Sequence, residues 1–308
     1  MSKPAAGTSQ KRIFSRKDYL APLPVPTGQK PSDMLNIIWR KNEVFLDIGN
    51  YSIGSAVMGL WPLVMVFLAM SYFTRNFALD FSQDILLLGS VITGIPTLLL
   101  IYALYRQVPL PIRFNRQRRE VCVPREDGEY WIVPWESVTA AATQHSSVSQ
   151  AGKNTMGLLF IGFENPDPTA KEGNQHFYWG FNCGGGTSAM ALWECVRSYM
   201  EIGPQSVPDS RVGVAPYEET QIGSIIMDLR KGNVLGVLWG IFCITILGTY
   251  FAEKLQNLKL SDPPDLPCPA IIEWSKPLPP EQWAKPSPEL CAAIAEREAE
   301  LTAQAQNP

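Results

Sequence analysis

The cysteines of this chain are the residues whose chemistry depends most on where they lie. Cys268 and Cys291 flank a proline-rich stretch near the C-terminus that also contains Trp274 and Trp283. A bond between the two sulfurs would close a loop of about 23 residues and stabilise the chain by roughly 3 kcal/mol in the chain-entropy estimate. Disulfides persist in oxidising compartments such as the bacterial periplasm. The alternative is two free thiols, so the compartment of this segment decides the chemistry.

Catalytic chemistry finds little support in the sequence. The chain has two histidines, His145 and His176, and no HExxH, CxxC or GxSxG pattern. His145 stands in a serine-rich polar run that is typical of a solvated loop. The glycines at 184–186 lack the Lys-Ser/Thr pair of a phosphate-binding loop. We therefore expect no catalytic residues, no metal, no cofactor and no enzyme activity.

Three apolar blocks dominate the hydrophobic pattern. They cover residues 54–73, 85–105 and 233–251, and none contains a charged residue. Each has about the 20 residues that an α-helix needs to cross a ~30 Å hydrocarbon core. A soluble core can bury one such helix, but three in a chain of this length are difficult to bury without lipid. The sequence therefore predicts three transmembrane helices.

The basic residues near these blocks predict the orientation. Lys and Arg are frequent in residues 1–52 and 106–231, whereas the short loop 74–84 has only Arg75 against two aspartates. Basic flanks stay in the cytoplasm. An odd number of spans then places the tail, residues 252–308, in the periplasm. The expected location is the bacterial inner membrane, with the N-terminus cytoplasmic and the C-terminus periplasmic.

This orientation gives the proline-rich tail an expected role. In this topology Cys268 and Cys291 would be the two cysteines in the periplasm, and we expect them to form a disulfide. Trp274 and Trp283 on such a frame would be rigid aromatic anchors for a partner, of the kind enriched at binding hot spots. Interfacial anchoring, or local packing against prolines, explains the two tryptophans equally well.

The segment 106–231 has the pattern of a small α+β domain. Short alternating runs with turn signals between them predict antiparallel strands in residues 111–125, 128–143, 157–165 and 175–182. The helical stripe Ala189, Trp193, Val196 and Met200 follows and ends before Gly203-Pro204. A meander closed by one helix is the outline of a pleckstrin-homology-like module, which many small α+β domains share. Residues 216–232 predict an amphipathic helix leading into the third apolar block.

A cluster of arginines begins this domain. Arg113, Arg116, Arg118 and Arg119 could contact anionic lipid headgroups, at about 1 kcal/mol for each residue near the surface. Their alternative role is only to keep the segment inside the cell. The two roles are compatible, and the second is sufficient to explain the cluster.

Two stretches carry a resemblance to a known family. WRKNEVFLDIGNYS precedes the first block, and LWECVRSYMEIGPQSVP closes the predicted domain. The second, with its W-E-x-x-R-x-Y-M-E-x-G-P run, resembles an uncharacterised family of bacterial inner-membrane proteins. Members often occur beside type VI secretion genes for toxic effectors. The resemblance covers about residues 36–250 and implies an immunity or accessory protein, as in a toxin-antitoxin pair.

The leading functional hypothesis is a three-span membrane protein that acts by binding a secreted effector or secretion component, without a nucleic-acid partner. The alternative is a membrane scaffold or lipid-sensing protein that uses a pleckstrin-homology-like module. A membrane enzyme or channel subunit active only as an oligomer is a third possibility. The apolar blocks contain no ionisable residue, which argues against a pore or pump.

Overall fold

The computed structural model describes residues 4–51, 53–149, 152–213 and 217–306. Its contacts divide the chain into two compact units. The sheet unit comprises Met1–Asn50, Leu110–Ser210 and Asp265–Pro308, and the helical unit comprises Tyr51–Pro109 and Arg211–Pro264. Each unit is therefore assembled from segments that are far apart in the sequence.

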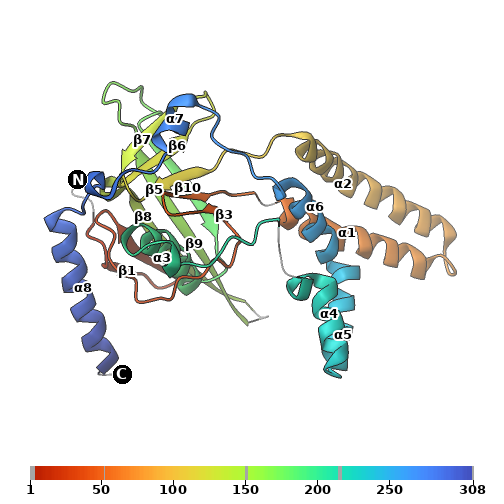
Figure 1. Ribbon diagram of the computed structural model, residues 1–308. Helices are drawn as coiled ribbons and strands as arrows, with labels where there is room; N and C mark the ends of the chain where they lie inside the picture. The colour runs from red at the N-terminus through yellow and green to blue at the C-terminus, as the bar shows by residue number, and fades with distance from the viewer. Residues whose placement is uncertain (1–3, 52, 150–151, 214–216, 307–308) are drawn as a thin grey trace. The chain divides into compact units, whose positions relative to one another are not determined.

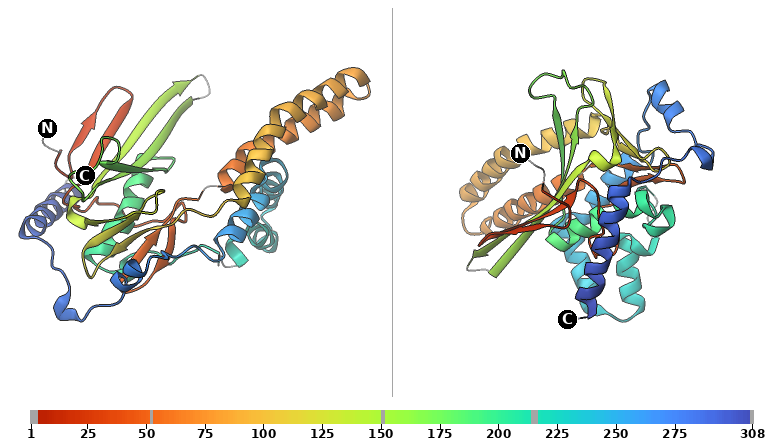
Figure 2. Two further views of the ribbon diagram at one scale, coloured as in Figure 1. Left: turned by 90° about the horizontal axis from the view of Figure 1, so that it is seen from above. Right: turned by 90° about the vertical axis from the view of Figure 1, so that its left-hand side faces the viewer.

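The sheet unit contains two five-stranded antiparallel sheets (Figure 1). Sheet A has the order β1 (Ser9–Lys11), β2 (Ser15–Ala21), β8 (Thr139–Ser149), β9 (Gly152–Glu164) and β10 (His176–Asn182). Sheet B has the order β3 (Ile38–Lys41), β4 (Phe45–Ile48), β5 (Ile112–Asn115), β6 (Glu120–Pro124) and β7 (Tyr130–Pro134). Figure 2 shows β8 and β9 as a long hairpin. The strands predicted between residues 111 and 182 are confirmed.

The first four strands come from the N-terminal segment, residues 1–52, for which the sequence predicts only a cytoplasmic location. β2 extends sheet A by pairing with β8, and β4 pairs with β5 in sheet B. Phe45 is opposite Asn115 and Ile48 is opposite Ile112 in this second pair. Since the helices α1 and α2 lie between residues 48 and 112, the helical hairpin is an insertion between two neighbouring strands.

The core lies between the two sheets and the helix α3 (Gly186–Glu201). Alternate residues of β8 and β9 enter it, such as Ala140, Leu159 and Ile161, because successive side chains of a strand point to opposite faces. Trp193 of α3 stacks on Trp135, with the ring centres 5.5 Å apart. The predicted strands and the amphipathic helix after them are confirmed, but the strands belong to two sheets and do not form one meander. The likeness to a pleckstrin-homology-like module stays a prediction.

Helix α3 is buried on more than its predicted face. The stripe of Ala189, Trp193, Val196 and Met200 is buried as expected, but so are residues between its members. The N-terminal segment covers them: Thr27 donates two hydrogen bonds to Glu194 Oε2, and the amide of Ser32 donates to the Ala191 carbonyl. The residues before β3 therefore complete the core around this helix.

The proline-rich tail also belongs to the sheet unit. It contains α7 (Pro269–Trp274) and α8 (Pro288–Gln306). Leu266 and Ile271 form a small buried cluster with Cys122 of β6, and Asn115 of β5 donates to the Trp274 carbonyl at 3.1 Å. The expectation that the tail has no core of its own to pack on is therefore corrected: the tail packs on sheet B.

The helical unit contains two helices long and apolar enough to cross a membrane, α1 (Ile53–Thr74) and α2 (Leu79–Tyr105). They correspond to the first two predicted spans and pack side by side (Figure 1). The Ser71 and Ser82 hydroxyls lie 2.8 Å apart between them, and Phe67 packs directly against Gly89. Small residues and buried hydroxyl pairs of this kind join helices within lipid.

The predicted third span is not one straight helix. α5 (Val234–Phe242) continues as a π-helical turn, Cys243–Leu247, and the chain then bends by 69° at Gly248 into α6 (Thr249–Leu260). The unit thus has two candidate spans, or three if the bent pair counts as one. The preceding helix, α4 (Gln221–Arg230), does not run directly into α5. It folds back on α5 through a turn at Gly232, and Ile225 packs against Gly240.

Candidate functional site

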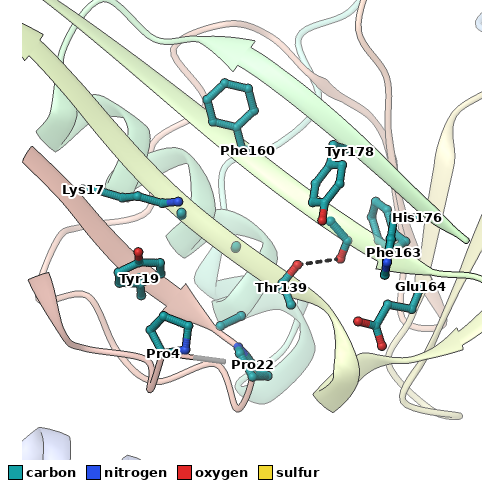
Figure 3. A pocket seen from close by; sticks show the side chains of 14 residues that line it. Pro4, Lys17, Tyr19, Pro22, Thr139, Phe160, Phe163, Glu164, His176 and Tyr178 are labelled. Atoms are coloured by element: carbon teal, nitrogen blue, oxygen red, sulfur yellow. Dashed lines mark hydrogen bonds between the residues drawn. The ribbon is translucent and has the colours of Figure 1, made fainter. Parts of the chain in front are cut away.

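A hollow of about 320 Å³ lies on the outer face of sheet A. Strands β2, β8, β9 and β10 all contribute to it, with Pro4 and Pro22 at its margin. Figure 3 shows Lys17 and Tyr19 on one side, Tyr178 and His176 on the other, and Thr139 between them. We call this hollow the sheet A groove.

Side-chain size explains why the face is hollow. In the strand registers Tyr19 is opposite Ala141, and Gly162 lies between Thr139 and Tyr178. The small residues Ala141 and Gly162 therefore form a floor between two tyrosines. A methyl group at position 162 would lie 2.5 Å from Thr139 Oγ1 and 2.8 Å from the Tyr178 ring. Only glycine leaves room for this tyrosine to lie across the strand.

Phe160 continues the aromatic wall along the same face. Its ring leans over Gly180 of the neighbouring strand, where a methyl group would lie 3.2 Å from it. Phe160 is 40% exposed and Tyr178 66% exposed. Aromatic rings that cover strand glycines stabilise a sheet, and this contact is sufficient to explain their positions. The exposed faces of the same rings also give the groove an apolar surface, whose exposure to water is unfavourable.

Charged groups stand at the ends of the groove. The Lys17 ammonium lies 4.9 Å from the centre of the Tyr19 ring, in a cation–π contact. Glu164 and His176 face one another across β9 and β10. The groove therefore offers aromatic faces in the middle, a cation near one wall, and a carboxylate and imidazole near the other. Such an arrangement binds and orients a ligand that has an apolar centre and polar ends.

Sequence reasoning found part of this groove. The alternation in β10 places His176 and Tyr178 on one face, although the sequence analysis used it only to predict a strand. The pairing of β2 with β8, which brings Tyr19 to the groove, has no signal in the local sequence. His145 is exposed on β8 and does not line the groove. Within the described ranges no group of three His, Cys, Asp or Glu side chains could hold a metal.

The four arginines predicted to contact lipid have partners within the sheet unit. Arg113 pairs with Asp47 at 2.6 Å and with Asp265 at 2.7 Å, and Arg119 pairs with Glu201 at 2.8 Å. Their side chains are 3% and 8% exposed. Neither guanidinium is therefore accessible to a lipid headgroup in this structure.

The other two arginines are half-buried. Arg118 Nε donates to the Trp274 carbonyl at 2.9 Å. Arg116 donates to the Ile202 carbonyl and lies over the Trp283 ring, 5.4 Å from its centre. The cluster thus joins the tail and the end of α3 to sheet B, and lipid contact by Arg116 and Arg118 stays a prediction.

The two tail tryptophans also turn their polar edges inward. Trp274 Nε1 donates to Glu120 Oε2 of β6 at 2.7 Å, and Trp283 Nε1 donates to the Leu278 carbonyl at 3.0 Å. Trp274 packs against the small cluster around Cys122. Of the two expected roles, packing of the tail is the one for which the structure provides contacts, and a role in partner binding stays a prediction.

The predicted disulfide is not formed in this structure, where Cys268 and Cys291 are both free thiols. Cys268 is half-buried in the cluster around Cys122, whereas Cys291 is exposed on α8. The neighbour of Cys268 is therefore Cys122 of sheet B. Burial raises the pKa of Cys122 to about 12, so its thiol stays protonated and unreactive at neutral pH.

The motif at residues 193–204 contains polar side chains whose contacts hold the sheet unit together. Glu194 accepts hydrogen bonds from Arg197 and from Thr27. The Tyr199 hydroxyl donates to the Asn42 carbonyl at 2.8 Å. Glu201 accepts from Trp135 Nε1 at 2.7 Å as well as from Arg119. These residues bind the N-terminal segment and sheet B to α3, which explains a distinctive motif without catalytic chemistry.

The fold and the groove together define a class: a two-sheet α+β unit, completed by three chain segments, with an apolar helical hairpin inserted between adjacent strands. Comparison of the chain with protein-family models, with curated proteins and with solved structures finds no match.

Proposed function

We propose that this chain is a membrane-anchored binding protein that holds its sheet unit at one face of the bilayer and captures a partner in the sheet A groove. The anchor is the α1–α2 hairpin, whose two helices are long and apolar enough to cross. The observation that carries the proposal is the exposed aromatic groove on a rigid sheet, with Lys17 at one wall and Glu164 and His176 at the other.

The way the sheet unit is assembled supports a two-span topology. Strands β4 and β5 are hydrogen-bonded across the hairpin insertion, and Arg113 pairs with Asp265 across the second helical excursion. Segments that pack in one core cannot lie on opposite sides of a membrane. The N-terminal segment, the central domain and the tail therefore share one side, and the bent α5–α6 segment returns to the side from which it came.

Basic residues near the spans support the cytoplasm as that side. Lys41 and Arg40 lie shortly before α1, and Arg106 ends α2, whereas the loop between α1 and α2 has Arg75 alone. Cytoplasmic flanks retain such positive charges. In this topology the tail is cytoplasmic, where thiols stay reduced, in accord with the free cysteines of the structure.

The partner we propose follows the family resemblance. A protein of this kind beside a type VI effector would act as its immunity or accessory protein, by binding an effector that acts at the envelope. Binding through the sheet A groove requires no reaction at the site, only complementary surface. Tyr178 and Phe160 supply the aromatic surface that such interfaces favour.

Co-expression with the effector of the same gene cluster tests this proposal. Cells with the parent protein should survive, and cells with the double variant Tyr178→Ala and Lys17→Glu should die although the variant reaches the membrane in normal amounts. Met156→Ala, on the same strand face but outside the groove, is the matched control and should protect. Full protection by the groove variant would exclude the groove, and no protection by the parent would exclude immunity.

A second candidate, a lipid-sensing or scaffold protein, is supported by a different observation. Helix α5 exposes apolar side chains around most of its surface, although it is too short to be a span by itself.

A further inference from the structure

Helix α5 carries a large exposed apolar surface that needs a covering. Leu235 is 80% exposed, Leu238 58% and Trp239 63%. The continuous helical segment Val234–Leu247 has 14 residues, so it is about 21 Å long at 1.5 Å per residue. The hydrocarbon core is about 30 Å thick. The segment therefore cannot cross the membrane, yet its surface is as apolar as that of a span.

The contacts of α6 place this segment at one end of the α1–α2 hairpin. Trp61 of α1 donates to the Thr245 carbonyl at 2.8 Å and stacks on Phe251 of α6, with ring centres 5.3 Å apart. Gly54, in the first turn of α1, packs against Ala252. α6 thus lies beside the beginning of α1, where a span meets the membrane surface.

The bend at Gly248 directs α5 away from the line of α6. Gly248 has φ +67°, a conformation that favours glycine. A methyl group there would also lie only 2.6 Å from the Trp61 ring, so the close packing requires glycine as well. The 69° bend lies beside Trp61, about two turns into α1, and turns α5 across the direction of α6. α4 is held in place by α6: Glu253 accepts from the Gln221 amide at 2.8 Å. The α4–α5 pair is therefore a braced hairpin that leaves the line of α6 beside the first turns of α1.

A second hollow, of about 330 Å³, lies along α4. Arg230 and Lys231 line one part of it, and Ile226 and Met227 line another. Tyr217 and Glu218 also line the hollow. The two cations can pair with the phosphate of a lipid, and the apolar residues beside them can contact its acyl chains. The single carboxylate leaves this rim positive.

We propose that the α4–α5 hairpin lies in the plane of the membrane, in the leaflet where α1 begins, and that the hollow along α4 binds an anionic phospholipid headgroup. Arg230 and Lys231 contact the phosphate, Ile226 and Met227 contact the first carbons of the acyl chains, and α5 is immersed among the chains. The occupant is lipid because the apolar surface of α5 continues into the apolar turn Cys243–Leu247, which packs on α1 of the hairpin. This inference rests on the membrane anchoring proposed above.

Fluorescence quenching in vesicles tests the depth of the hairpin. The full chain, with Cys243, Cys268 and Cys291 replaced by serine, receives one bimane-labelled cysteine and is reconstituted with lipids brominated on their acyl chains. A label at Leu238→Cys on α5 should be quenched as strongly as one at Leu98→Cys on α2, and one at Met156→Cys on sheet A should not. Quenching at 98 without quenching at 238 would overturn the in-plane hairpin. Absence of quenching at both would instead overturn the proposed anchor.

The headgroup site has its own test with a label at Tyr217→Cys. Brominated phosphatidylglycerol should quench this label at several-fold lower mole fraction than brominated phosphatidylcholine. The double variant Arg230→Gln and Lys231→Gln should remove that preference, because it removes both cations of the hollow. Lys254→Gln on α6 removes one charge outside the hollow and should leave the preference unchanged. Equal quenching by the two lipids in the parent, or a preference that survives the double variant, would overturn the site.

Discussion

Arg113 Nη2 lies 2.7 Å from Asp265 Oδ1, so an arginine of β5 holds the residue at which the chain returns from the helical unit. The same guanidinium pairs with Asp47 of β4 at 2.6 Å. Three segments that are separated by the two helical excursions therefore meet at one group of charges, built around the buried pair of Arg113 and Asp47. The Asp47 side chain is completely buried, so water cannot replace the arginine there.

Replacing Arg113 by Met should cost about 3–5 kcal/mol of unfolding free energy, because it leaves a buried carboxylate without its partner. Denaturant unfolding of the purified protein in detergent, followed by tryptophan fluorescence, measures this. Lys276→Met is the matched control, since its ion pair with Glu273 is exposed and should contribute at most about 1 kcal/mol. Equal effects of the two substitutions would show that the buried charge group does not hold the unit together.

Docking of the tail should weaken in acid. Burial alone would raise the pKa of Glu136, but hydrogen bonds from Ser287 and the charge of Arg119 outweigh it and lower this pKa below its ordinary value. Asp265 behaves alike: burial opposes the effect, and hydrogen bonds from Arg113 and the Leu266 amide, together with nearby arginine charges, lower its pKa. A lowered pKa contributes stability that is present above the unfolded pKa and is lost as pH falls through the folded value.

Limited proteolysis over a pH series measures this loss. Cleavage between residues 265 and 308 should stay slow from pH 7 to about pH 5 and accelerate below about pH 4, as the pH falls toward the lowered pKa values of the two carboxylates. The variant Glu136→Gln should already be more sensitive at pH 7. An unchanged cleavage rate down to pH 3, with an acid-active protease, would contradict the role of the two carboxylates.

Reporter fusions should distinguish two crossings from three. An alkaline phosphatase inserted after Phe77, between α1 and α2, should be active, and fusions after Gly128 and at the C-terminal end should be inactive. Phosphatase folds only in the periplasm, so the pattern follows from the shared core of the sheet unit. A C-terminal fusion as active as the one at Phe77 would mean that α5–α6 crosses the membrane and that the tail does not dock as described.

A methyl group at the floor of the sheet A groove should disturb the groove directly. Gly162→Ala should destabilise the protein by about 1–3 kcal/mol, because Thr139 Oγ1 and the Tyr178 ring occupy the space. Thr139→Ala in addition should recover part of that cost, as contacting residues are not additive. Gly180→Ala, with a 3.2 Å approach to Phe160, is the milder comparison. Thermal unfolding of the parent, Gly162→Ala, Thr139→Ala and the double variant measures the coupling, and strict additivity would contradict this geometry.

The tail cysteines should behave as thiols. Cys291 should react with a maleimide in the folded protein within minutes, since it is exposed, and Cys291→Ser should change the stability by less than about 0.5 kcal/mol. Mobility on a denaturing gel should be the same with and without reductant. If reductant changes the mobility of the parent protein, and if Cys268→Ser and Cys291→Ser each abolish that change, the predicted disulfide forms after all.

The part of the fold that local pattern could predict is the part built from neighbouring strands. β5 to β10 follow one another as hairpins and short connections, and α3 shows its stripe at Trp193 and Val196. β3 and β4 have only four residues each, and Asp47 in the middle of β4 looks like a surface residue. Its burial depends on Arg113, which is far away in the sequence. Short strands that depend on distant partners leave no periodic signal.

The groove and the third apolar block also depend on contacts between distant parts of the sequence, which local pattern does not predict. Tyr19 meets Ala141 only because β2 joins sheet A beside β8, a long-range pairing that hydrophobic alternation does not specify. The block at residues 233–251 has the composition of a span, but the glycine hinge at 248 and the contact of Trp61 with it decide its direction. Composition indicates affinity for lipid and does not indicate whether the chain crosses.

The pairing of β4 with β5 also sets the order of events during synthesis. β4 leaves the ribosome before the hairpin, and its hydrogen-bonding partner follows only after both apolar helices have been made. In the proposed two-span topology, sheet B closes after α1 and α2 have entered the bilayer and the chain has returned to the side of β4. A hairpin inserted with the wrong number of crossings would leave β4 as an unpaired edge, which is prone to aggregation and accessible to proteases. Under that topology, folding of the sheet unit depends on correct membrane insertion, and the residues after Asp265 dock last.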